Sequence, residues 1–261
     1  MPATIHSRPA ARELSAWQFR TDSDDVGTTE GWDDPNTAWP DARSVSVPHS
    51  WQEQSDLREY TGVGWYRTTV QAPDRDTDER TFLRFGAVDY EATAWVNGVR
   101  VGDHEGGYLP FALDVTDALD GGENTVVLRV EDPEDLSELP HGKQGEPWYT
   151  RVSGPWQAVE LVTVPDVRVT DVRATPDLSV DTLTVELSVS VSRDDLDATV
   201  IVERDGESVV DATVDASAGT ASLELSIPDA EYWTPDDPTL YDLRVRLEAD
   251  EGVDTYETYV G

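Results

Sequence analysis

The sequence contains no cysteine, so the chain can form neither a disulfide bond nor a thiolate metal site, and it offers no cysteine nucleophile. Its four histidines are scattered without the spacing that is typical of a zinc site. We therefore predict no metal and no cofactor. An acidic cluster formed by Asp22, Asp24 and Asp25 could at most hold calcium loosely.

Lysine is almost absent: Lys143 is the only one, and the other Lys/Arg positions are arginines. With 54 acidic residues against 19 basic ones, the formal charge is −35. Such a charge repels itself at low ionic strength, whereas in 1 M salt the screening length falls to about 3 Å. We therefore expect a halophilic protein that unfolds when salt is removed. The same charge argues against nucleic acid and anionic membranes as partners, and it leaves neutral sugars compatible.

Long apolar runs are also missing. No stretch of about 18 apolar residues occurs, and the N-terminal segment lacks the apolar centre of a secretory signal. We therefore expect a soluble cytoplasmic protein, unless a leader was removed. The hydrophobic fraction of 38% is sufficient for a folded chain, which argues against disorder.

No segment sustains a helical apolar stripe over three turns, and at most short turns are expected near Arg12–Ala16 and Thr116–Leu119. Instead, β-branched and aromatic residues alternate with polar ones between Gly, Pro, Asp and Asn, which predicts an all-β fold. The Asn97-Gly98 pair predicts a tight hairpin turn with positive φ. In the first part of the chain the expected strands are 65–71, 81–86, 92–97, 99–102, 125–130 and 157–164.

The composition of the sequence changes near Pro165, where Trp and Gly become rare and Val, Thr and Asp begin to alternate. We predict two β domains, residues 1–165 and residues 166–261. The second contains roughly seven strand-like segments and an Asp205-Gly206 turn, which suits an immunoglobulin-like sandwich. A (β/α)8 barrel needs about 250 residues of alternating strands and helices, so this chain does not contain one.

A series of short aromatic and glycine motifs occurs in a fixed order. They read VPHSWQ (47–52), GVGWYR (62–67), GAVDYEATAWVNG (86–98), HEGGYLPF (104–111), GKQ (142–144), WYTRVSGPWQAVEL (148–161) and YWTPDDPTLYDLRV (232–245). Together they resemble glycoside hydrolase family 2, the β-galactosidase and β-glucuronidase-like enzymes. The resemblance implies a galactose-binding-like, jelly-roll sugar-binding domain followed by an immunoglobulin-like sandwich. In that family a catalytic (β/α)8 barrel follows, and here it would be supplied in cis or as a separate subunit.

The resemblance also shows which chemistry is missing. Retaining glycosidases use two carboxylates about 5–5.5 Å apart, and in this family the acid/base glutamate follows an asparagine. Here Asn36, Asn97 and Asn124 are followed by Thr, Gly and Thr, so no such pair exists and we name no catalytic residue. In the galactosidase branch, an aspartate that helps to bind sodium and sugar stands where this chain has Trp148, and an asparagine stands where it has Thr61. Both departures argue against galactose specificity and against the sodium site.

Two aromatic residues, Trp148 and Tyr149, are the strongest candidates for contact with a ligand. They follow the glycine-containing polar segment 141–147, and an aromatic plane beside amide and cationic donors suits stacking on a pyranose ring. The alternative is that one of them packs beneath the loop as core. Most of the other tryptophans are expected in the core.

Further candidates lie around HEGGYLPF, where paired glycines would leave His104 and Glu105 projecting from a loop. In the alternative interpretation, Tyr108 and Phe111 fill the sandwich and the glycines only make the turn. Asp89 and Tyr90 could hydrogen-bond to sugar hydroxyls, and a turn-capping role for Asp89 is equally compatible.

The sequence therefore favours a non-catalytic, carbohydrate-binding N-terminal portion of a family 2 β-glycosidase, which frames the sugar site of a barrel located elsewhere. Two alternatives remain open. One is a free-standing carbohydrate-binding protein that uses the same loops. The other is a structural β-sandwich subunit of an assembly, which would bind no sugar.

Overall fold

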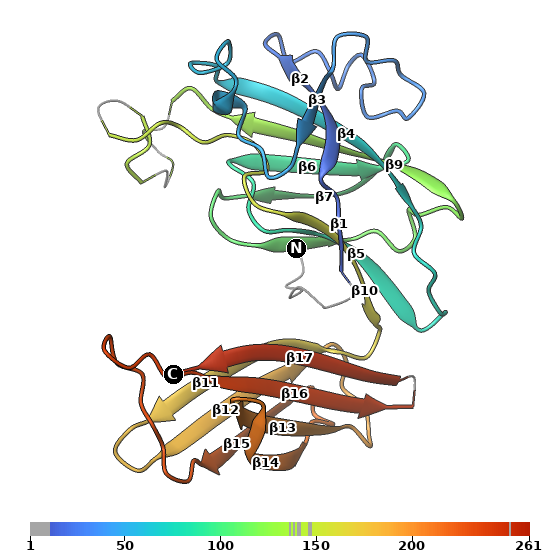
Figure 1. Cartoon of the computed structure of the whole chain (residues 1–261). Coiled ribbons are helices and arrows are strands. Elements are labelled where there is room, and N and C mark those ends of the chain that lie inside the picture. Colours follow the sequence, from blue (N-terminus) through green and yellow to red (C-terminus); the bar gives the residue numbers. More distant parts are fainter. Residues whose placement is uncertain (1–10, 136, 138, 140–141, 146–147, 251) are drawn as a thin grey trace. The chain divides into compact units, whose positions relative to one another are not determined.

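The computed structural model describes residues 11–135, 137, 139, 142–145, 148–250 and 252–261 (Figure 1). The chain divides into two compact units, one made of Met1–Arg75 and Arg80–Thr163 and the other of Asp76–Glu79 and Val164–Gly261. In the described residues the regular elements are β-strands and one 3-10 turn, η1 at Trp51–Glu53. The prediction of an all-β chain, a jelly-roll followed by an immunoglobulin-like sandwich, is confirmed.

The first unit contains two antiparallel sheets. The larger is six-stranded, in the order β3-β2-β4-β9-β6-β7, and the smaller is four-stranded, in the order β1-β10-β5-β8. The strands of the larger sheet are β2 (Ala16–Asp22), β3 (Arg43–Ser46), β4 (Gly62–Gln71), β6 (Glu91–Val96), β7 (Val99–Glu105) and β9 (Glu123–Asp132). Those of the smaller sheet are β1 (Arg12–Glu13), β5 (Glu79–Phe85), β8 (Phe111–Asp114) and β10 (Val159–Pro165).

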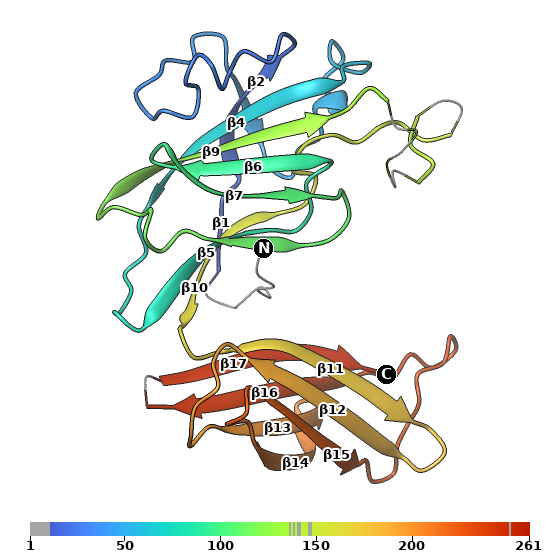
Figure 2. The same ribbon diagram turned by 180° about the vertical axis from the view of Figure 1, so that it is seen from behind.

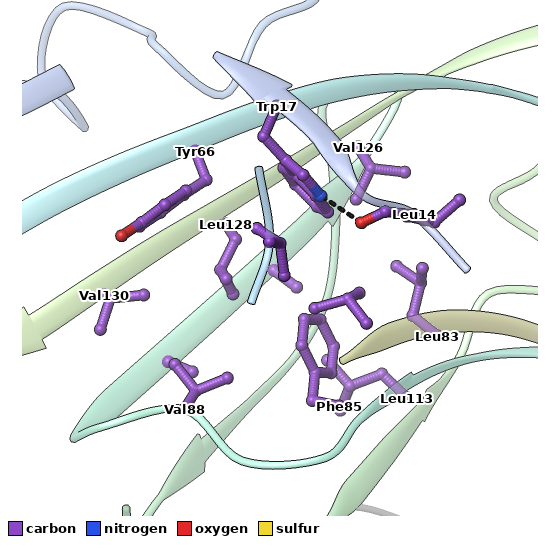
Figure 3. Packing of buried hydrophobic residues seen from close by; sticks show 14 of the residues in the cluster. Leu14, Trp17, Tyr66, Leu83, Phe85, Val88, Leu113, Val126, Leu128 and Val130 are labelled. Atoms are coloured by element: carbon purple, nitrogen blue, oxygen red, sulfur yellow. Dashed lines mark hydrogen bonds between the residues drawn. The ribbon is translucent and has the colours of Figure 1, made fainter. Parts of the chain in front are cut away.

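The core of the first unit is apolar and follows the two-residue period of its strands. Every second side chain of β9, at Val126, Leu128 and Val130, is fully buried and contributes to the same cluster. Figure 3 shows these residues with Trp17, whose indole nitrogen donates a hydrogen bond of 2.6 Å to the Leu14 carbonyl. The cluster joins strands from both sheets, so it holds the two layers of the unit together.

The other face of the six-stranded sheet carries a second buried cluster. It contains Trp32, Trp39, Val63, Trp65, Trp95 and Val127. Trp32 and Trp39 come from the connection between β2 and β3, while the remaining members lie on strands. This connection therefore covers part of the sheet with side chains, and the expectation that most tryptophans are core holds for these four.

The second unit is a sandwich of a three-stranded sheet, β11-β12-β15, and a four-stranded sheet, β14-β13-β16-β17 (Figure 2). Its strands are β11 (Val169–Asp177), β12 (Thr182–Val189), β13 (Asp197–Arg204), β14 (Glu207–Asp215), β15 (Thr220–Ser226), β16 (Tyr241–Ala249) and β17 (Gly252–Val260). The inward residues of β13, Ala198, Val200 and Val202, are fully buried in one cluster. This alternation explains why the sequence pattern predicts a sandwich here.

Both predicted hairpin turns have the expected backbone. Asn97 and Gly98 have φ values of 52° and 80°, and Asp205 and Gly206 have 53° and 80°. The helical turn expected near Arg12–Ala16 is wrong, because Arg12 pairs with Leu161 in the sheet and β2 begins at Ala16. In the described part of the chain no helix has the length and apolar character needed to cross a membrane.

Candidate functional site

A pocket of about 360 Å³ opens on the first unit between segment 58–61 and a second segment, of which Gly145 and residues 148–151 are described. Its described lining residues are Arg58, Glu59, Tyr60, Thr61, Gly145, Trp148, Tyr149, Thr150 and Arg151. This volume lies within the range of pockets for small molecules, roughly 300–1,000 Å³. The pocket therefore has room for a sugar ring, and it includes two residues that the sequence singles out.

Trp148 and Tyr149 are the exposed apolar surfaces of this pocket, with 65% and 68% of their surface accessible to solvent. Their backbone is held in a tight loop, in which the Gly145 amide donates to the Tyr149 carbonyl at 2.8 Å and the Trp148 amide donates to the Gly145 carbonyl at 2.9 Å. Gly145 has a φ of 92°, which glycine adopts without strain. Neither ring packs into the core, so both present a flat surface that a ligand can contact.

The opposite wall of the pocket is anchored by Tyr60. Its hydroxyl donates to the Val63 carbonyl at 2.7 Å, and its carbonyl accepts a hydrogen bond of 3.1 Å from the Trp51 indole. Burial raises the pKa of the Tyr60 hydroxyl. Since Trp51 is fully buried, segment 58–61 is tied to the core of the unit.

Arg151 lines the pocket, but its guanidinium is already occupied. Its Nε donates to Asp132 Oδ2 at 2.7 Å, and its Nη2 binds the other oxygen of the same carboxylate. Asp132 is buried at the end of β9 and also accepts a hydrogen bond from the Ser153 hydroxyl. The Gln52 amide donates to that hydroxyl at 2.6 Å. This network fixes the backbone after the aromatic pair and neutralises the charge of Arg151.

Arg58 differs from Arg151, because it is exposed and has no hydrogen-bonding or ion-pair partner among the described residues. The single lysine lies close by, with the Lys143 ammonium 4.9 Å from the centre of the Trp148 ring. At that distance a cation is attracted to the face of an indole. The pocket region therefore offers two cations that no described carboxylate neutralises.

Asp89, which the sequence proposes as a sugar contact, is only 4% exposed and does not line the pocket. The Gln144 amide donates to Asp89 Oδ2 at 2.8 Å and to the Tyr108 hydroxyl at 2.9 Å. The oxygen of the same amide accepts from the Val152 N–H at 2.7 Å. Gln144 lies just before Gly145, so these three hydrogen bonds tie the loop of the aromatic pair to the jelly-roll.

The other three predicted contacts also lie outside the pocket lining. Tyr90 is buried, and its hydroxyl donates to Glu105 Oε1 at 3.2 Å. Burial first, and then Glu105, raises the pKa of that hydroxyl. His104 is half-buried and stacks on the buried Phe111 ring at 4.0 Å between ring centres, and burial lowers its pKa. Tyr108 is exposed, so the alternative interpretation, in which Tyr108 and Phe111 fill the sandwich, holds only for Phe111.

Sequence reasoning missed Arg58, Tyr60 and Arg151 as parts of the pocket. Segments 58–61 and 145–151 are far apart in the chain, and no local pattern connects them. An available signal was the position of Tyr60 two residues before the GVGWYR motif, which alone does not distinguish a wall from a loop.

The pocket lining contains one described carboxylate, Glu59, whereas retaining hydrolysis requires two.

In the part of the chain that the structure describes, no group of three or more His, Cys, Asp or Glu side chains could hold a metal ion. Within the acidic cluster near the N-terminus, Asp22 is buried and accepts hydrogen bonds from the Val26 and Gly27 amides and the Trp65 indole. Its carboxylate stabilises the β2–β3 connection.

Comparison with known proteins gives two adjoining family matches. The family described as "Glycosyl hydrolases family 2, sugar binding domain" matches residues 12–165, and "Glycosyl hydrolases family 2" matches residues 167–261. A β-glucuronidase of Paenibacillus borealis is 30% identical over 96% of this chain and 45% of its own length. A β-glucuronidase of Rattus norvegicus is 28% identical over 95% of this chain and 44% of its own length.

Solved structures of β-glucuronidases also match this chain along nearly its whole length. The β-glucuronidase of Lactobacillus rhamnosus has a TM-score of 0.78 and 30% identity, over 99% of this chain and 45% of that one. The enzyme of Ruminococcus gnavus reaches a TM-score of 0.81 at 22% identity, which shows a common fold. The chain thus spans a little under half the length of these relatives.

Proposed function

Because the chain belongs to glycosyl hydrolase family 2, we propose that it is a carbohydrate-binding, non-catalytic portion of a β-glycosidase. The observation that carries this proposal is the pocket with two exposed aromatic rings, Trp148 and Tyr149, on the unit that matches the sugar-binding domain. Exposed aromatic planes beside hydrogen-bonding groups are the usual means of holding a pyranose ring. Their exposure favours ligand contact over a role in packing.

Hydrolysis would then be performed by a catalytic barrel, in the same polypeptide or in a separate subunit. Two observations support this division: the pocket lining has one described carboxylate, and the relatives extend well beyond the matched part. The names of these relatives favour a β-glucuronidase as the whole enzyme. The loops of this chain would frame the sugar at the mouth of that barrel.

A surface of the second unit suits a protein partner. Tyr232, Trp233, Leu240 and Leu178 are exposed apolar residues close to one another around a small apolar pocket. The Tyr232 hydroxyl donates to the Leu178 carbonyl at 3.2 Å, and a Cβ added to Gly261 would lie 2.8 Å from the Leu240 side chain and 3.0 Å from Trp233. Adjoining exposed apolar side chains of this size are typical of interaction sites.

The proposal is tested with the 261-residue chain in high salt, using nitrophenyl β-D-glucuronide and β-D-galactoside as substrates. No turnover is expected, and appreciable turnover by this chain alone would refute a non-catalytic role. Titration with a panel of saccharides, followed by tryptophan fluorescence, should show binding that Trp148→Ala abolishes. Absence of binding to every saccharide would refute carbohydrate binding and leave the structural role.

A free-standing carbohydrate-binding protein is the second candidate. It would use the same pocket and the same aromatic pair. The two candidates differ in affinity, because a portion that frames a barrel should bind sugar weakly until it is docked. Affinity of the isolated chain in the micromolar range would favour the free-standing protein, whereas weaker binding would favour the enzyme portion.

A further inference from the structure

We infer that Gln52 is a positioning residue, whose side-chain amide ties the two walls of the pocket to each other and so fixes the space that a saccharide enters. The inference rests on the proposed function, since it assumes that a saccharide binds between these walls. Gln52 itself does not line the pocket. It acts through the backbone of both walls, so it determines affinity without touching the ligand.

Gln52 lies in the 3-10 turn η1, and its side chain is only 7% exposed. Burying an amide costs free energy unless its polar atoms find hydrogen-bonding partners. The amide nitrogen can donate twice, and the amide oxygen can accept twice. In this chain all four possibilities are used, by partners at Ser50, Tyr60 and Ser153.

The nitrogen of the amide reaches both walls. It donates to the Ser153 hydroxyl at 2.6 Å and to the Tyr60 carbonyl at 3.4 Å. Tyr60 belongs to segment 58–61, and Ser153 closely follows the segment of the aromatic pair. The two partners lie 8 and 101 positions from Gln52 along the chain. One side chain therefore connects two segments that are far apart in sequence.

The oxygen of the amide strengthens the same connection. It accepts from the Ser153 backbone N–H at 3.1 Å and from the Ser50 hydroxyl at 2.8 Å. A single amide thus holds Ser153 at its hydroxyl and at its backbone, and Ser153 is fully buried. A carboxylate of the same shape has no donor when it is ionised, and methionine offers only a weak acceptor. Neither replacement can reproduce the connection.

The other links between the walls are indirect. Among the described residues, no hydrogen bond joins segment 58–61 directly to the segment of the aromatic pair. The Trp51 N–H donates to the Ser153 carbonyl at 3.2 Å, and the Trp51 indole donates to the Tyr60 carbonyl at 3.1 Å. These bonds remain when the Gln52 amide is removed. The fold should therefore persist while the walls gain freedom to move apart.

The first test compares saccharide affinities. The 261-residue chain and its variants are titrated in fixed high salt with methyl β-D-glucuronide, methyl β-D-glucoside and methyl β-D-galactoside, and tryptophan fluorescence reports binding. Gln52→Met keeps the length of the side chain and removes the amide. It should weaken binding of the saccharide that the wild type binds best by about tenfold, the effect of one or two net hydrogen bonds. Gln52→Glu should weaken it too, because a carboxylate repels the Tyr60 carbonyl.

The second test reads the spacing of the walls without a ligand. Since the chain has no cysteine, Glu59→Cys supplies a single thiol that can carry a bimane fluorophore on one wall. An indole quenches bimane at contact distance, and Trp148 supplies an indole on the other wall. The part of the quenching that Trp148→Phe removes therefore reports how closely the walls approach. Most of this part should be lost in Gln52→Met, which a role in stability alone does not predict.

Asn124 offers a matched control, because it is another buried amide of the first unit, 1% exposed, with both amide atoms in hydrogen bonds. Its partners are Asn97, Asp120 and Gly122, none of which lines the pocket. Asn124→Leu should lower the melting temperature as Gln52→Met does. It should leave saccharide affinity and bimane quenching unchanged, which separates positioning from general destabilisation.

Unchanged affinity or unchanged quenching in a folded Gln52→Met protein would overturn the inference, and so would an equal loss in Asn124→Leu. If neither Gln52 variant folds, hydrogen exchange in the wild type decides: the Ser153 N–H should exchange more slowly when saccharide is bound, and an unchanged rate would contradict the inference. If the wild type binds no saccharide, the proposed function fails. The quenching comparison then still shows whether Gln52 sets the spacing of the walls.

Discussion

Acidification should destabilise the first unit through His49, a buried ring that the fold holds in its neutral form. The side chain is 6% exposed, and its ring packs edge-on against Phe19 at 5.3 Å between ring centres. The Gln54 amide donates to His49 Nε2 at 3.0 Å, and Nδ1 lies 2.9 Å from the Tyr66 hydroxyl. Burial lowers the pKa of the ring from 6.5 to about 4.

The sign and size of the effect follow from this shift. Between pH 6.5 and pH 4 the unfolded chain binds a proton at His49 that the folded chain does not bind, so stability falls as the pH falls. A shift of one unit corresponds to about 1.4 kcal/mol, and the part completed between pH 7 and pH 4.5 amounts to about 2 kcal/mol. The loss is absent above pH 7, where both states are neutral.

Carboxylates also titrate in this range, so the measurement is a difference between two proteins. Denaturant unfolding of the wild type and of His49→Asn is followed by tryptophan fluorescence at several pH values in fixed high salt. Asn retains a polar group near Nδ1 and does not titrate. The variant should be less stable at pH 7 and should lose about 2 kcal/mol less between pH 7 and pH 4.5. Parallel stability curves for the two proteins would refute the reasoning.

Three further perturbations test other parts of the chain. Gln144→Ala removes the three hydrogen bonds that tie the loop of Trp148 and Tyr149 to the jelly-roll, so it should weaken saccharide binding several-fold and lower the melting temperature only slightly. Unchanged binding would show that the loop needs no such anchor. Glu91 lies directly opposite a glutamate on β7 and another on β9, and burial together with these charges raises its pKa. Glu91→Gln should therefore stabilise the protein by about 0.2–1 kcal/mol in low salt and by less in 1 M salt. A gain independent of salt would contradict the repulsion argument. Because of the charge of −35, the melting temperature should rise with KCl, and a flat dependence in a thermal scan would reject the proposed adaptation to salt.

The larger features of the fold were predictable because they depend on local patterns. Alternating side chains on β9 and β13 report the two-residue period of a half-buried strand, and Asn97-Gly98 reports a turn with positive φ. The short strand β1 was misread as a helical turn. Its two residues are exposed, so only their pairing with β10 identifies them as a strand.

The candidate site was predictable only in part. The exposed aromatic pair was inferred from its neighbours in sequence, whereas Asp89 was considered as a sugar contact because it follows the expected strand 81–86. In the fold its carboxylate binds Gln144, which lies 55 residues further along the chain. Burial of Asp89 and the position of its partner depend on tertiary packing, which the periodicity of the sequence does not predict.

The local sequence therefore determines the strands and the hairpin turns, since each depends on residues a few positions apart. The absence of cysteine excludes thiol chemistry in any fold. The charged character of the pocket arises differently. It requires segment 58–61 and segment 145–151 to meet, Asp132 to neutralise Arg151, and Arg58 to be left without a partner. Asp132 and Arg151 are 19 positions apart and the two segments are about 90 positions apart, and these relations form only when the two sheets close around a common core.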